Sequence, residues 1–279
     1  MMVGDYLFVS KISYGAKIPN TPLSFPFAHH TLPFTTDTKS YLEWFELPYF
    51  RLPGLGHVKN NDIVVFNYPD GDTVALNYQD RSYYQICRDN HYASLYNSPN
   101  SQILTDYDQQ GNPVYSPVGE VVYRPVDKRE NYVKRCTAIS GDTLLIKNKE
   151  LFINSKPAYV APTMQYMYYV RTDGTCFFGM KKLLTQFDIT DDINYLGEDS
   201  LGKVFRVNLP NDKVEEFKKL SFVKSVQPML DSAGVYKSEV FPHNPHFKWN
   251  KDNYGPLYIP KAGVTVNIDT AEIALYDRI

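Results

Sequence analysis

The stretch NYVKRCTAISGDTLLIKNKELFI, residues 131–153, decides the fold that we expect for this chain. Its first part, Asn131–Ala138, has the apolar and β-branched content of a strand. Two shorter apolar runs, Thr143–Ile146 and Glu150–Ile153, flank a turn at Asn148-Lys149, and this arrangement predicts a hairpin. Short strands joined by tight turns are typical of an all-β core.

Two further strands are predicted on the amino-terminal side of this stretch. Asp5–Ser13 alternates between two faces, and Asn61–Phe66 starts with a turn and continues as a β-branched run. The chain between them is rich in proline and then in aromatic residues, which indicates irregular structure. Residues 70–117 are rich in Asp, Asn, Gln, Ser and Tyr, so we expect an insertion of loops and short elements, with some helix around residues 80–95.

The pattern of the sequence changes at about residue 156, from short strands joined by turns to a mixture of strand-like and helix-like segments. Segments that resemble strands and helices follow in the order β-α-β-β-α-β, which is the order of a split βαβ, ferredoxin-like unit. Asn211 is expected to cap the second helix, and the chain from residue 257 onward is expected to return to β structure. The six segments are residues 158–171, 180–187, 192–196, 203–209, 212–222 and 226–230.

Composition excludes several classes of protein. The 279 residues suggest about two domains, and 43% apolar residues are enough to exclude a globally disordered chain. A net charge of −2 gives no reason to expect a nucleic-acid partner. The three cysteines lack the spacing of a metal site, and no apolar run of about 18 residues indicates a membrane span.

Lys134 is the residue of the predicted strand at 131–138 whose side chain is a candidate for catalysis. It is adjacent to Arg135, and neighbouring residues on a strand point to opposite faces, so Lys134 shares its face with Tyr132 and Cys136. If that face is inward, loss of water favours the neutral amine, which can act as a general base. The alternative is a lysine that extends from an edge strand into water.

Other candidate sites are weaker. Cys136 could be a thiol nucleophile, but no motif supports this role, and a buried inert thiol is the alternative. His29 and His30 point apart on an extended chain and have no acidic partner at ligand spacing, so no metal is expected there. The same holds for His243 and His246, which lie in a stretch broken by proline.

The aromatic run at residues 41–50 has two interpretations. Tyr41, Trp44 and Phe45 could form a patch at a membrane interface, where Trp and Tyr are enriched. They could equally line a core, since large aromatic side chains dominate core packing.

Three ordered motifs resemble the boxes of the bacterial type I signal peptidases. They are VGDYLFVSK at residues 3–11, NDIVVF at residues 61–66, and YVKR at residues 132–135, which is followed by GDT at residues 141–143. The long inserts resemble those of the large signal peptidases of Bacteroides-like bacteria. The family is a membrane-anchored serine endopeptidase with a Ser/Lys dyad that removes signal peptides from exported preproteins.

The resemblance assigns roles to individual residues. Lys134 becomes the general base that takes the proton from a serine hydroxyl. Arg135 is expected to make a structural salt bridge to an acidic residue of the family's last box, and Asp142 is expected to give structural support. No cofactor or metal is implied. The residues expected to contact the extended substrate or line its small pockets are Met1, Leu7, Val65, Tyr132 and Val133.

Two departures from the family pattern limit what we expect of this chain. The nucleophilic serine of the family would fall about five residues before Met1, and the final box would fall beyond Ile279. We therefore expect an internal fragment that carries the lysine without the serine and is inactive as it stands. The alternative is a non-catalytic paralogue that binds extended peptides or docks to a secretion complex.

The resemblance also implies an organisation and a location. We expect a mainly β fold, with a signal-peptidase-like β-barrel or sheet core and an inserted α+β, ferredoxin-like domain. The expected partners are signal peptides and the membrane surface, the latter through the family's anchor, which we expect this chain to lack, and through Tyr41, Trp44 and Phe45. The expected location is the outer, periplasmic side of the cytoplasmic membrane. The expected boundaries are 1–69 and 118–155 for the core, 70–117 for an insertion within it, 156–235 for the α+β domain and 236–279 for the return to the core.

Overall fold

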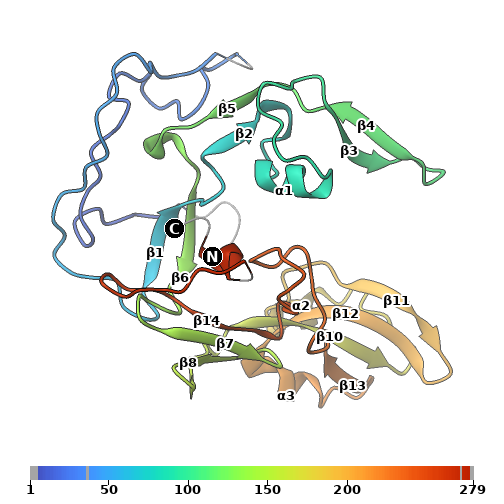
Figure 1. Cartoon of the computed structure of the whole chain (residues 1–279). Helices are drawn as coiled ribbons and strands as arrows, with labels where there is room; N and C mark the ends of the chain where they lie inside the picture. Colours follow the sequence, from blue (N-terminus) through green and yellow to red (C-terminus); the bar gives the residue numbers. More distant parts are fainter. Residues whose placement is uncertain (1–5, 36–37, 271, 277–279) are drawn as a thin grey trace. The chain divides into compact units, whose positions relative to one another are not determined.

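The computed structural model describes residues 6–35, 38–270 and 272–276. These residues form two compact units, one within residues 1–136 and one within residues 137–279. The described part contains fourteen strands and four short α-helices, and every paired strand is antiparallel (Figure 1). The predicted mainly β fold is therefore confirmed.

Three two-stranded ribbons make up the sheets of the first unit. The first pairs β1 (Ile63–Asn67) with β6 (Asn131–Arg135), the strands predicted at residues 61–66 and 131–138. The other two pair β2 (Thr73–Ala75) with β5 (Val121–Tyr123) and β3 (Gln102–Tyr107) with β4 (Pro113–Pro117). Two 3₁₀ turns, Leu76–Tyr78 and Val126–Lys128, connect these elements.

The region predicted as loops and short elements has a core of its own. Helix α1 (Tyr83–Asp89) confirms the helix expected around residues 80–95, and the Ser82 hydroxyl caps it by accepting a hydrogen bond from Gln85 N at 3.3 Å. The helix packs against strands from both neighbouring ribbons. The buried residues of this core are Ala75, Tyr83, Ile86, Cys87, Leu95, Ile103 and Val118.

The strand predicted at Asp5–Ser13 is wrong for the residues that the structure describes. Residues 6–13 form no strand, and the rings of Tyr6 and Phe8 are fully exposed. Alternation alone does not make a strand, because a strand also needs a partner and a face to bury. The chain that follows is tied down by isolated bridges instead, such as Lys17 with Arg51.

The second unit contains the predicted hairpin. Strands β7 (Thr143–Lys147) and β8 (Glu150–Ile153) pair across a turn in which Asn148 and Lys149 have φ values of 49° and 67°. Two positive φ values fit a type I′ turn, the connection that matches strand twist. Strands β9 (Lys156–Pro157) and β14 (Tyr254–Tyr258) complete the sheet, in the order β14-β7-β8-β9.

The predicted ferredoxin-like order is confirmed within this unit. Strands β10 (Gln165–Thr172), β11 (Asn194–Asp199), β12 (Gly202–Pro210) and β13 (Val223–Pro228) form one sheet in the order β13-β10-β12-β11. Helix α2 (Lys181–Gln186) lies between the first two strands in sequence, and α3 (Val214–Phe217) lies between the last two (Figure 1). The core residues are Tyr168, Val170, Phe177, Phe187, Ile189, Phe205, Val207, Leu209, Val214 and Phe217.

Several predicted boundaries in this unit are wrong. The helix predicted at residues 212–222 is only α3, preceded by a 3₁₀ turn at Asn211–Lys213, and the Asn211 side chain caps neither of them. After β14 the described residues form no further strand, and α4 (Ile273–Tyr276) replaces the expected return to β structure. The domain boundaries expected from the sequence stay a prediction.

Candidate active site

Lys134 lies on β6, and the pairing of β6 with β1 decides which residues surround it. Lys134 is opposite Val64, and Tyr132 is opposite Phe66. Directly paired residues of an antiparallel ribbon point to the same side, so these four side chains share one face. The Tyr132 ring also stacks on Tyr68, with ring centres 4.7 Å apart.

The other face of the ribbon carries the remaining strand candidates. Val65 is opposite Val133, and Arg135 is opposite Ile63. Of the expected substrate-binding residues on the ribbon, the register therefore brings Tyr132 to the face of Lys134 and places Val65 and Val133 on the opposite face. A substrate strand paired along an edge of the ribbon would still reach side chains on both faces, because its own side chains alternate.

Neither Lys134 nor Arg135 is buried, so the inward-facing Lys134 considered in the sequence analysis is not what the structure shows. The side chains of Lys134 and Arg135 are both exposed, so the condition that water is removed from Lys134 is not met within the described residues. Arg135 donates from Nη1 to the carbonyl oxygen of Asn61 at 2.8 Å. The Arg135 side chain is exposed, so its positive charge stays in contact with water and does not depend on a buried ion-pair partner.

Backbone hydrogen bonds extend the ribbon beyond Arg135. Asn61 N donates to the Cys136 carbonyl at 2.6 Å, and Cys136 N donates to the Asp62 carbonyl at 2.8 Å. The Asp62 carboxylate accepts from Lys59 N at 2.9 Å and from the Tyr14 hydroxyl at 2.7 Å, which lowers the pKa of Asp62. The end of the ribbon that carries Lys134 is thus fastened to the loop before β1.

Asp142 supports the start of the hairpin in the second unit. Its carboxylate accepts from Ile139 N at 3.0 Å and from Asn154 Nδ2 at 2.7 Å. The Asn154 Oδ1 atom in turn accepts from Thr143 N at 2.9 Å. These bonds tie the turn before β7 to the end of β8, which is a structural role for this carboxylate.

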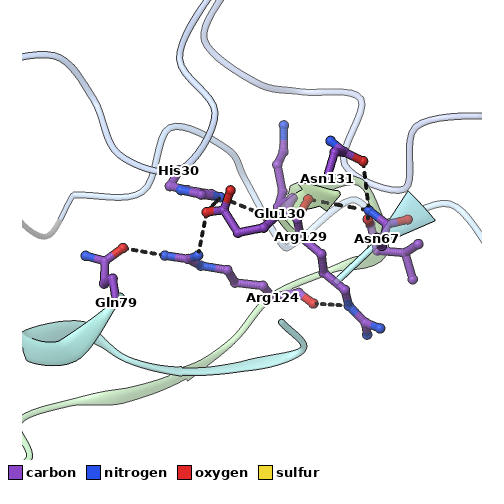
Figure 2. Close-up of polar contacts among 9 residues, drawn as sticks. His30, Asn67, Gln79, Arg124, Arg129, Glu130 and Asn131 are labelled. Atoms are coloured by element: carbon purple, nitrogen blue, oxygen red, sulfur yellow. Dashed lines mark hydrogen bonds and ion pairs between the residues drawn. The ribbon is translucent and has the colours of Figure 1, made fainter. Parts of the chain in front are cut away.

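A polar cluster that sequence reasoning missed lies where β6 begins, at the end of the ribbon away from Lys134 (Figure 2). Arg124, which is buried, has Nη1 at 3.6 Å from Glu130 and donates to Gln79 Oε1 at 2.6 Å. His30 Nε2 lies 2.9 Å from the Lys128 carbonyl and 3.4 Å from Glu130. No motif marks these residues, because they come from three separate parts of the chain.

The electrostatics of this cluster follow from burial. Loss of water lowers the pKa of His30 first of all, and the charge of Arg124 lowers it further, while Glu130 acts in the opposite direction. Burial also lowers the pKa of Lys17, whose ammonium donates to Asn67 Oδ1 at the end of β1. The hydrogen bonds of His30 and Lys17 therefore join the long loop before β1 to the end of the ribbon where β6 begins.

A comparison with protein families gives a match to this chain. The family described as "Signal peptidase, peptidase S26" matches residues 1–200, which include the ribbon of β1 and β6 and the hairpin of β7 and β8. The chain belongs to this family. Members of the signal peptidase family are serine endopeptidases associated with membranes. No curated protein and no solved structure gave a match.

The structure separates the three aromatic residues expected at the membrane surface of this signal peptidase. Tyr41 is buried, and the Lys128 ammonium lies 5.3 Å from the centre of its ring. Burial raises the pKa of Tyr41 to about 12. The prediction that Tyr41 contacts lipid is therefore wrong, whereas Trp44 (77% exposed) and Phe45 (45% exposed) remain available.

The remaining sequence candidates lie apart from Lys134 or outside the described residues. Leu7 is half exposed in an irregular segment, and Met1 lies outside the described residues. Cys136 is partly buried, and His243 Nδ1 lies 2.8 Å from the Ser238 carbonyl. Within the described residues no group of three His, Cys, Asp or Glu side chains could hold a metal ion. The helices of that same part are all too short or too polar to cross a bilayer.

Proposed function

We propose that this chain carries the general-base half of the Ser/Lys dyad of a type I signal peptidase. The observation that carries the proposal is the family match over residues 1–200, together with the YVKR motif at residues 132–135 on β6. The exposed side chain leaves Lys134 accessible to a serine hydroxyl, although the described residues do not supply the loss of water that would favour the neutral amine.

The chemistry assigned to Lys134 is proton transfer. The neutral Nζ atom accepts the proton of a serine hydroxyl while the serine oxygen attacks the carbonyl carbon of the peptide bond. The protonated Lys134 then gives the proton to the departing amine, which leaves an acyl-enzyme. A water molecule deprotonated by the same amine releases the acyl group and restores the serine.

The substrate is proposed to be a signal peptide bound as an extended strand along the ribbon. Main-chain hydrogen bonds supply affinity in this mode, and pockets for alternate side chains supply specificity. We assign the lining of these pockets to Tyr132 on one face of the ribbon, to Val65 and Val133 on the other, and to Leu7, while Met1 lies outside the described residues. The bond from Arg135 to Asn61 holds the ribbon, and Asp142 holds the hairpin.

The family pattern places the nucleophilic serine directly before the VGDYLFVSK motif, so a test of the proposed base needs a polypeptide that carries this serine box. The test joins a segment with the family's S-x-M-x-x-T box directly in front of the VGDYLFVSK motif and assays both polypeptides on the same preprotein.

Two outcomes of this test decide between the proposals. Turnover by the extended polypeptide alone supports the general-base assignment, provided that Lys134→Ala abolishes it. If the extended polypeptide stays inactive but binds the preprotein, the non-catalytic paralogue is the better account.

We further propose that the catalytic unit works at the outer surface of the cytoplasmic membrane and contacts lipid through Trp44 and Phe45. Their exposed rings support this contact, since amphipathic aromatic side chains gather at the level of the headgroups. The measurement is partitioning into liposomes, with both residues changed to serine.

A further inference from the structure

Two tight turns in the first unit repeat one pattern. Phe25-Pro26-Phe27-Ala28 and Leu32-Pro33-Phe34-Thr35 both carry a proline followed by a phenylalanine. In each turn the fourth residue's N–H points to the first residue's carbonyl, at 3.4 Å for Ala28 and 3.2 Å for Thr35. Phe27 has φ of 63° and Phe34 has φ of 66°. Proline at the second position and a positive φ at the third define a type II turn.

Phenylalanine is an unfavourable residue at the third position of such a turn. Glycine is usual there, because a side chain with a Cβ is strained at positive φ. Packing does not compensate for the strain, since the rings of Phe27 and Phe34 are fully exposed, at 111% and 108%. Two large apolar rings thus stand in water at positions where the backbone favours glycine.

The chain that carries the two turns is anchored at its base. Phe25 N donates to the Ser40 carbonyl at 2.7 Å, and Leu42 N donates to the Leu23 carbonyl at 3.0 Å. The buried Tyr41 ring lies between these bonds in sequence and packs against Lys128. We call residues 22–35 and 38–45 the aromatic arm; its base is fixed, and its two turns project Phe27 and Phe34.

Lys39 and Glu43 form an ion pair among the described residues of the aromatic arm, with the Lys39 ammonium 2.7 Å and 2.8 Å from the two Glu43 oxygens. The sequence also has Asp37 between Phe34 and Lys39, outside the described residues. Because Lys39 and Glu43 are paired, neither of these two charges has to lose its water alone when the arm meets an apolar phase.

We infer that Phe27 and Phe34 are wedges that insert into the lipid bilayer and hold the first unit at the membrane surface. The inference deepens the proposed function, because the signal peptidase family is membrane-associated. A bilayer fits the two rings better than a protein partner does. A single ring on a narrow turn needs no complementary pocket in a fluid apolar phase. The free energy gained when each ring enters the lipid offsets the backbone strain of its turn.

The experiment replaces both rings with the residue that the turns prefer. The 279-residue chain and its Phe27→Gly/Phe34→Gly variant are compared by sedimentation with phosphatidylcholine vesicles, whose zwitterionic surface gives basic side chains elsewhere no net charge to attract. We expect the partition coefficient to fall about tenfold for one replacement and about a hundredfold for both. The melting temperature should stay equal or rise, because glycine relaxes both turns.

Two further variants serve as controls. Phe27→Leu/Phe34→Leu keeps an apolar side chain on each turn and should retain most of the binding. Phe178→Ala removes a ring that is 98% exposed in the second unit and should leave the partition coefficient unchanged. An equal loss of binding in Phe178→Ala would mean that any exposed ring drives binding and would overturn the assignment to the two turns.

Three other results would overturn the inference. They are no binding of the unchanged chain to vesicles, unchanged binding of the double glycine variant, and a clear drop in its melting temperature, which would show that the rings serve folding. Because the assay contains no peptide substrate, its result is independent of proteolysis. Failure of the cleavage experiment would leave the wedges in place, and failure of the wedges would leave the Lys134 assignment in place.

Discussion

Replacement of Asp252 by alanine should destabilise the second unit by about 1–4 kcal/mol. Asp252 is 1% exposed; one carboxylate oxygen accepts from the Tyr166 hydroxyl on β10, and the other accepts from Asp231 N at 2.7 Å. Alanine leaves Asp231 N without its acceptor, whereas the Tyr166 hydroxyl keeps a second acceptor, the Met229 carbonyl at 3.3 Å. Both donors are partly buried, and a donor left without an acceptor costs about 1–3 kcal/mol. Burial and the Asp252 carboxylate raise the pKa of Tyr166, so its hydroxyl stays a donor at neutral pH.

The assay is urea unfolding followed by tryptophan fluorescence. The chain has two tryptophans, so in a Trp44→Phe background Trp249 reports on the second unit, where its ring lies 4.8 Å from Tyr254. Asp252→Asn keeps one acceptor and should cost about half as much, and Lys251→Ala, an exposed neighbour, should cost less than about 0.5 kcal/mol. A loss in Asp252→Ala no larger than that in Lys251→Ala would refute the reasoning.

Three further predictions concern pH, backbone crowding and lipid. Because burial lowers the pKa of His30 below the unfolded value of about 6.5, acidification through that range should destabilise the first unit. His30→Gln should flatten this dependence in urea midpoints between about pH 7.5 and 5. Gly202→Ala should cost about 2 kcal/mol or more, because φ is +129° and the new Cβ would meet a carbonyl oxygen at 1.9 Å; Gly197→Ala, with open space around it, should cost less in the same unfolding assay. Trp44→Ser/Phe45→Ser should weaken liposome partitioning about tenfold or more, and unchanged partitioning would remove these two residues from the lipid contact.

The elements that sequence predicted well are those whose signal is local. The hairpin of β7 and β8 follows from two apolar runs and from Asn148-Lys149, which adopt the positive φ values of the turn. The ferredoxin-like order follows from the alternation of strand-like and helix-like segments in residues 158–230. The ends of α3 were not predictable, because Leu220 and Phe222 pack against the core although the helix ends at Phe217.

The signals that failed depend on partners distant in the sequence. Alternation at residues 5–13 predicts a strand, but nothing local shows whether another strand pairs with it. Tyr41 is a residue type that is common at membrane interfaces, but it is buried here, and Lys128, 87 positions later in the sequence, is one of the residues that contact its ring. The polar cluster of His30, Arg124 and Glu130 has no sequence motif at all. The role of Lys134 came from family resemblance, since its strand alone left two interpretations open.

The measurement that tests the account most directly is preprotein cleavage by the chain extended with the serine box, with Lys134 changed to alanine. The account predicts a fall in kcat of at least about a thousandfold, because the serine loses its only assigned base. Lys147→Ala, which removes an exposed lysine from β7, should stay within about twofold of the parent. Cleavage by the Lys134→Ala variant at a rate close to the parent's would contradict the assignment of the general base.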